Sequence, residues 1–177
     1  MWVDDVLHFW FQELQPAAWF SKDDELDAQI RARFGDLHQA LMLERIDIPT
    51  TPHGLLAAII VLDQFSRNLY RGSARAFAAD ARALGLARRS IELGFDRELQ
   101  PLERKFVYMP YMHSEDPQAQ AECVRLFTEL NDAESLKYAI EHREIIDRFG
   151  RFPHRNRTLG RTASAEEETF LKHHAGF

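Results

Sequence analysis

The stretch "LLAAIIVLDQFSRNLYR", residues 55–71, changes from wholly apolar to polar in the middle of one predicted helix. Its first eight residues leave no polar face, so a helix through them must be buried by neighbours on all sides. In the second part, Asp63 and Arg67 are four positions apart, as are Gln64 and Asn68, so each pair shares a helix face. We therefore expect a buried helix that carries hydrogen-bonding side chains from the core towards a polar region.

Helical spacing of apolar residues recurs along the whole chain, and no stretch alternates apolar and polar residues as a strand does. The length of 177 residues and the apolar fraction of 45% fit one domain with a packed core. Short connections favour antiparallel neighbours. We predict an all-α protein, with one domain over residues 1–177, as an antiparallel array of about seven or eight helices. The expected helices cover residues 2–14, 22–44, 52–70, 76–93, 101–113, 117–130, 132–149 and 164–174.

Capping residues mark the ends of several of these helices. A polar side chain before a helix accepts hydrogen bonds from the first free backbone amides, and proline suits the first helical position. Glycine after a helix closes it with a left-handed residue. The predicted starts are Ser21 with Asp24, Thr51 with Pro52, Asp116 with Pro117, and Ser164 with Glu167, and the predicted stops are Gly94 and Gly150.

The composition bears on where the protein is found. Cys123 is the lone cysteine and cannot form an internal disulfide, and the N-terminus carries acids where a secretory signal needs basic residues. The longest apolar run, residues 55–62, falls short of the roughly 20 residues that span a bilayer. We expect a cytoplasmic protein without a membrane segment.

The familiar motifs of metal and cofactor binding are missing from the sequence. There is no cysteine pair, no HExxH zinc motif, no calcium loop and no glycine-rich phosphate loop. His173 and His174 are adjacent, so their rings cannot face the same way on a helix. Signatures of a catalytic serine or cysteine are also missing. We expect no metal and no cofactor.

One basic segment stands out in an acidic chain. "RFGRFPHRNRTLGR", residues 148–161, holds five arginines and no acid, and without these arginines the formal charge of −6 becomes −11. The counter-charge is one of three: the protein's own carboxylates, a nucleic acid, or a small anion. The glutamates of residues 165–168 lie near enough to neutralise Arg157 or Arg161. A nucleic acid is disfavoured because its binding favours a pI above about 9, and the pI of this chain is 5.7.

Three histidines lie beside charged residues. Pro110 is expected to kink or end a helix, which places His113 and Glu115 just beyond the break, although such a bend also serves simply to fit a helix around the core. His142 lies in a charged helix and His154 in the arginine loop, residues 150–163. Histidine titrates near neutral pH and can act as a general acid or base. The catalytic candidates are therefore His113, His142 and His154.

Four segments resemble an uncharacterised bacterial family, a domain of unknown function placed within the tetratricopeptide-like superfamily. They are "VLHFWF" at 6–11, "DQFSRN" at 63–68, "YMPYMHSED" at 108–116 and "FGRFPHRNRTLGRTASAEEETFL" at 149–171. The resemblance covers nearly the full length. It implies an all-α, tetratricopeptide-like fold with no established activity and no assigned catalytic residues.

Three hypotheses for function follow. In the first, a pocket binds a small organic anion or an acidic or C-terminal peptide, with no role for nucleic acid or membrane. In the second, the protein is an enzyme in which a histidine acts as acid or base on a small anionic substrate. In the third, the polar motifs are purely structural. The predicted ligand-binding residues, expected to enclose one polar cavity, are Gln64, Arg67, Asn68, Arg151, His154 and Arg155.

Overall fold

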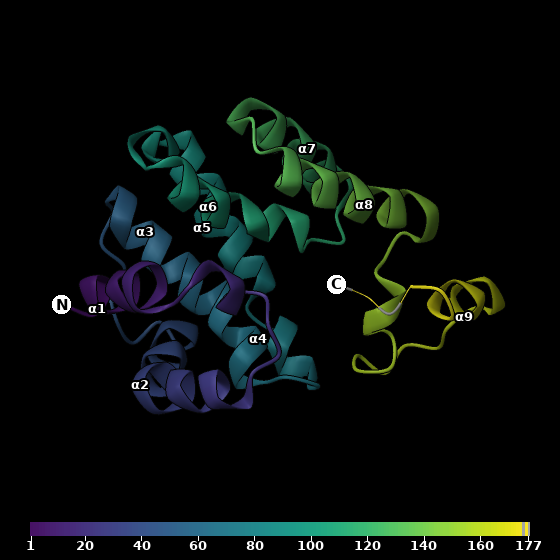
Figure 1. The fold of residues 1–177 in the computed structure, drawn as a ribbon, viewed down its shortest axis with the longest axis horizontal. Coiled ribbons are helices and arrows are strands. Elements are labelled where there is room, and N and C mark those ends of the chain that lie inside the picture. The colour runs from purple at the N-terminus through teal and green to yellow at the C-terminus, as the bar shows by residue number, and fades with distance from the viewer. Residues whose placement is uncertain (175, 177) are drawn as a thin grey trace. The chain divides into compact units, whose positions relative to one another are not determined.

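Residues 52–69 form three consecutive helical parts in the computed structural model, which describes residues 1–174 and 176 (Figure 1). The segment begins as α3 (Pro52–Ile59), with Thr51 Oγ1 accepting a hydrogen bond from Gly54 N at 3.0 Å. It continues as a π-helical part, η3 (Ile60–Phe65), and ends as α4 (Ser66–Leu69). The side chains expected to be buried in this segment have no exposed surface, which confirms the prediction for Leu56, Ile59, Ile60 and Leu62.

The protein is all-helical, and no strand occurs in the part of the chain that the structure describes. This confirms the predicted fold class. The chain divides into two compact units, the first made of Met1–Arg71 with Arg75–Pro110, and the second made of Gly72–Ala74 with the residues from Tyr111 onward. That residues 1–177 act as one domain, and that the arrangement is tetratricopeptide-like, stay predictions.

The first unit packs its helices around the 52–69 segment. α3 contacts α1 and α5, and α2 contacts η3 and α4. The core between them is aromatic: the Phe65 ring lies 5.0 Å from that of Phe34 and 5.5 Å from that of Trp10. The remaining elements that lie wholly or mostly in this unit are α1 (Trp2–His8), η1 (Phe9–Glu13), η2 (Pro16–Ala18), α2 (Asp24–Met42), η4 (Ala74–Phe77), α5 (Asp80–Glu92), η5 (Phe95–Glu98) and α6 (Pro101–Met112).

The second unit is a helical hairpin followed by the arginine loop. α7 (Pro117–Leu130) and α8 (Ala133–Phe149) lie side by side (Figure 1), joined by a short turn. The loop contains a 3₁₀ turn, η6 (Pro153–Arg155), which contacts the last helix, α9 (Ala165–Leu171). Phe152, fully buried, packs on Ile145 and Ile146 of α8. The loop is thus packed against the helices of its own unit.

Most capping predictions are confirmed. Asp116 and Ser164 accept hydrogen bonds from the first amides of α7 and α9, and Ser164 forms a capping box with Glu167. Gly150 closes α8 at a φ of 69°, a conformation that favours glycine. Ser21 was the wrong residue, because the cap of α2 is Asp23, whose carboxylate accepts from two backbone amides.

Several helix boundaries differ from prediction. α2 covers Asp24–Met42, within the predicted 22–44. α5 begins at Asp80, because residues 74–77 form a separate 3₁₀ turn. α9 ends at Leu171 and not at residue 174. α6 ends at Met112, close to the predicted residue 113, and Pro110 does not end it. A proline removes one backbone donor, and so close to the end of a helix this loss is small enough for the helix to continue.

No helix among the described residues has both the length and the apolar character that a membrane crossing needs.

Candidate functional site

The polar end of the 52–69 segment contains a fully buried carboxylate, Asp63. Its Oδ2 accepts a hydrogen bond from Gln64 Nε2 at 2.6 Å, and its Oδ1 lies 3.9 Å from Arg67 Nη2. Asp63 and Arg67, which were expected to share a helix face, therefore lie close together, with Asp63 buried and Arg67 partly exposed.

Arg67 is bound chiefly by a residue outside the motif. Its two terminal nitrogens donate to the two oxygens of Asp80 at 2.8 and 3.0 Å, and Nη1 also donates to the carbonyl of Ala76. Its guanidinium lies 4.9 Å from the centre of the Phe77 ring. Burial alone would lower the pKa of Arg67, but the charges of Asp63 and Asp80 raise it overall. The donors of Arg67 are thus directed at groups of its own unit.

Asn68 is held in the same way. Its Nδ2 donates to Asp27 Oδ1 at 2.8 Å, and Arg71 binds both oxygens of that carboxylate, each at 2.8 Å. Asp27 is itself buried on α2. The polar residues of the motif therefore bind one another and carboxylates of the first unit.

Ser66 and His38 form a buried pair that does not have the geometry of a nucleophile and its base. Ser66 Oγ donates its one proton to the Leu62 carbonyl at 2.6 Å and lies 2.7 Å from His38 Nε2. Nε2 must therefore be the donor in the second bond. Burial, with a contribution from Arg75, lowers the pKa of His38 to about 4, so the ring is neutral at pH 7 and is a weak base.

In the second unit, Arg151 forms a two-pronged ion pair with Glu167. Arg151 Nε and Nη2 donate to the two carboxylate oxygens at 2.7 and 2.8 Å, and Nη2 also donates to the Thr162 carbonyl at 2.9 Å. Glu167 Oε2 also accepts from Ser164 N at 2.7 Å. The hydrogen bond from Arg151 is the main reason why the pKa of Glu167 falls to about 2.

Arg161 forms a second such pair, with Glu115. Its terminal nitrogens donate to the carboxylate at 2.7 and 2.9 Å, and its Nε donates to Asn156 Oδ1 at 2.9 Å. Glu115 Oε1 also accepts from Phe152 N at 2.8 Å. Arg148 pairs with Glu166 at 2.8 Å on the surface. Three of the five arginines of this segment thus have the protein's own carboxylates as counter-charge.

Two of the three candidate histidines, His142 and His154, lie beside Phe152. The rings of His142 and His154 lie 5.5 and 5.7 Å from the Phe152 ring, and the guanidinium of Arg155 lies 4.6 Å from it. Burial is the main cause that lowers the pKa of His142 to about 3, with His113 the next largest contribution. Burial, followed by the charge of Arg155, lowers the pKa of His154 to about 4.

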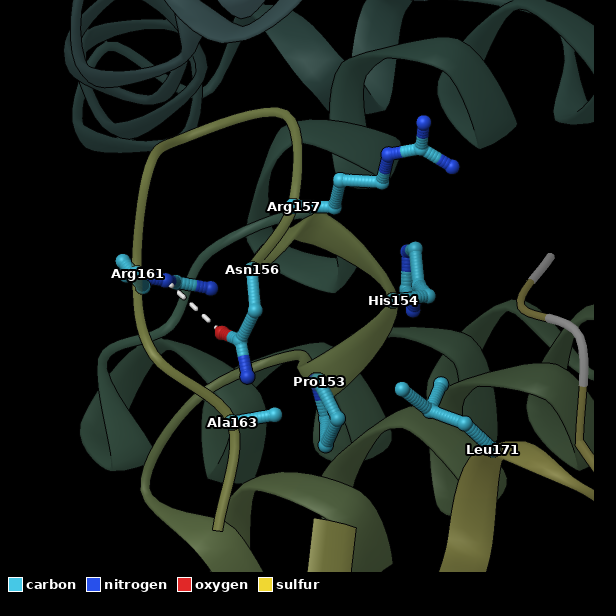
Figure 2. A pocket seen from close by; sticks show the side chains of 7 residues that line it. All are labelled: Pro153, His154, Asn156, Arg157, Arg161, Ala163 and Leu171. Atoms are coloured by element: carbon cyan, nitrogen blue, oxygen red, sulfur yellow. Dashed lines mark hydrogen bonds between the residues drawn. The ribbon is translucent and has the colours of Figure 1, made fainter. Parts of the chain in front are cut away.

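A cavity of about 440 Å³ opens beside His154 within the second unit (Figure 2). It is lined by Pro153, His154, Asn156, Arg157, Arg161, Ala163 and Leu171. The guanidinium of Arg157 makes no hydrogen bond or ion pair with any residue that the structure describes, and the side chain is exposed. No cluster of three or more potential metal ligands is found among residues 1–174 and 176.

The model of a family described as "Bacterial protein of unknown function (DUF924)" matches residues 6–175 of the chain. The chain belongs to the DUF924 family. A solved structure from Agrobacterium tumefaciens, titled "Structure of Protein of Unknown Function ATU0120", is 37% identical, with a TM-score of 0.92 over 97% of each chain. A search of curated proteins gave no match.

Of the six ligand-binding residues predicted for this DUF924 protein, His154 lines the cavity. Gln64, Arg67 and Asn68 share carboxylates of the first unit, whereas Arg151 and Arg155 lie in the loop of the second. That the two groups enclose one cavity stays a prediction. The prediction missed Asn156 and Leu171 and left Arg157 as a candidate for internal pairing. No local pattern separates Arg157 from its paired neighbours.

The buried histidines predict how the stability of this DUF924 protein depends on pH. His142 has a folded-state pKa of about 3, below the ordinary 6.5, so its contribution is complete above pH 6.5 and is lost as pH falls from there towards 3. We expect the free energy of unfolding to fall over this range. In His142→Gln the slope should be smaller by up to about 1.4 kcal/mol per pH unit.

Denaturant titrations at a series of pH values between 6.5 and 4 measure this slope. His173→Gln is the matched control because His173 is exposed, and it should leave the slope unchanged. Equal slopes in the His142 variant and the parent protein would contradict the prediction.

Proposed function

We propose that the cavity of the second unit binds a small organic anion. The observation that carries this proposal is the position of Arg157, which lines the cavity, is exposed, and has no counter-charge among the described residues. None of the lining residues is acidic. An arginine offers a planar fork of donors that fits a carboxylate or phosphate. An anion would thus supply the counter-charge that the described residues do not provide.

The size of the cavity favours a small molecule over a peptide. Pockets for small ligands typically measure about 300 to 1,000 Å³, and this one measures about 440 Å³. An acidic peptide requires a longer groove that follows its backbone. Of the two ligand classes in the binding hypothesis, the small organic anion is therefore better supported.

Acid–base catalysis by histidine has less support. An effective general base has a pKa near the working pH, whereas the pKa of His142 is lowered to about 3 and that of His154 to about 4. Both rings are neutral at pH 7 and are weak bases. His154, which lines the cavity, can position a ligand by hydrogen bonding, and this role belongs to binding.

Replacing Arg157 with alanine should weaken anion binding by at least about tenfold, because a hydrogen bond to a charged group contributes about 1.5 to 3 kcal/mol. Melting temperatures and calorimetric titrations with benzoate, hexanoate and phosphate measure this loss. Arg143→Ala removes the same charge from an exposed position paired with Asp147 on α8, and this control should bind as the parent does. The proposal fails if none of these anions binds to the parent protein, or if Arg157→Ala binds them equally well.

A further inference from the structure

The cavity lining has two chemically different parts. Arg157, Asn156 and Arg161 bring polar groups, whereas the other side is apolar and consists of Pro153, Ala163 and Leu171. In Figure 2 the His154 ring lies between Arg157 and Leu171. A ligand that fills the cavity would therefore contact a cation at one end and hydrocarbon at the other.

The polar side of the cavity has two arginines, but only one of their guanidinium groups is open to a ligand. Arg161 uses all three of its nitrogens within the protein: two donate to Glu115, and Nε donates to Asn156 (Figure 2). Glu115 also balances its charge. Arg157 remains as the fork that can take both oxygens of one carboxylate.

His154 adds a polar contact but no charge. Burial, together with the neighbouring Arg155, lowers its pKa to about 4, so the imidazole is neutral at pH 7. A neutral ring can donate or accept one hydrogen bond beside the arginine. The cavity thus offers the positive charge of Arg157 beside the neutral ring of His154, and this matches a ligand with a single negative charge.

The volume leaves room for a ligand larger than a simple ion. A water molecule takes about 30 Å³ of liquid, so the 440 Å³ of the cavity exceed the space that an inorganic anion fills. Such an ion would leave the Pro153, Ala163 and Leu171 surfaces in contact with water. A ligand with an apolar body removes that surface from water, which favours binding.

We propose that the ligand is a monocarboxylic acid with an apolar body, whose carboxylate binds Arg157 and whose hydrocarbon part contacts Pro153, Ala163 and Leu171. This inference rests on the proposed function and narrows it to one class of compound.

Calorimetric titration of the full chain at pH 7 with hexanoate, acetate, phosphate and hexanamide tests the inference. Hexanoate should bind at least about tenfold more tightly than acetate or phosphate, a factor equivalent to about 1.4 kcal/mol, and hexanamide should bind at least tenfold more weakly than hexanoate. If acetate or phosphate binds as tightly as hexanoate, the inference that the ligand has an apolar body is wrong, whereas the proposal that the cavity binds an anion is kept. If hexanamide matches hexanoate, or nothing binds, the anion site itself is overturned.

Two variants test the two ends of the ligand separately. Arg157→Ala should weaken hexanoate and acetate alike, whereas Leu171→Ala should weaken hexanoate several-fold and leave acetate unchanged. Leu171 is partly exposed at the end of α9, so its truncation should leave the fold intact, and unchanged acetate binding reports that the site is still formed. Unchanged hexanoate binding in Leu171→Ala would overturn the apolar contact.

Discussion

Replacing Phe152 with alanine is expected to lower the free energy of unfolding by about 3 to 5 kcal/mol. Phe152 has no exposed surface and packs on Ile145 and Ile146 of α8. Truncation removes the ring and leaves a cavity between the loop and the helical hairpin. The rings of His142 and His154 would lose their common neighbour, so the effect should lie in the upper part of that range.

Chemical denaturation of Phe152→Ala and of the parent protein at pH 7 measures this difference. Phe20→Ala is the matched control because 59% of Phe20 is exposed, and exposed positions usually change stability by no more than about 0.5 kcal/mol. A loss below about 1 kcal/mol in Phe152→Ala would mean that the loop is not anchored by this ring.

Replacing Asp63 with alanine is expected to cost about 3 to 5 kcal/mol, because removing one partner leaves the other charge buried. Asp63 is fully buried and accepts from Gln64 at 2.6 Å. Its charge also helps to keep Arg67 protonated in the interior. Without it, Arg67 depends on Asp80 alone among its two carboxylate partners.

Denaturant unfolding of Asp63→Ala and Asp63→Asn separates charge from shape. The asparagine keeps the size of the side chain and loses the charge, so a similar cost in both variants assigns the effect to the charge. Asp36→Ala, at an exposed position of α2, controls for loss of an aspartate and should be near neutral. If Asp63→Ala proves as stable as the parent, the buried charge pair contributes nothing to stability.

The fold could be predicted to a large extent because its signals are local. The starts of α3, α7 and α9 are marked by the capping residues Thr51, Asp116 and Ser164. The apolar run of residues 55–62 identifies the core segment. The π-helical parts were not predicted. A π-helical turn has the same composition as an α-helical one, and what selects it is the packing of the surrounding residues.

The site was harder to predict because its partners are distant in sequence. Arg67 binds Asp80, 13 positions away, and Arg161 binds Glu115, 46 positions away. Spacing of four residues correctly paired Asp63 with Arg67, but it cannot identify the stronger partner. The local sequence does not separate the exposed Arg157 from Arg148, Arg151 and Arg161, because only the fold shows which of them reach a carboxylate.

The π-helical part η3 holds one residue more than an ordinary α-helical turn, because its hydrogen bonds close at i→i+5 and not at i→i+4. Loss of one residue between 60 and 65 would therefore allow an ordinary α-helix through the core, with the residues after it still on nearly the same faces. The bonds of Ser66 to His38 and of Asn68 to Asp27, which measure 2.7 and 2.8 Å, would then be kept. Relatives that share these pairings but lack the π-helical turn should therefore place a one-residue gap within this segment.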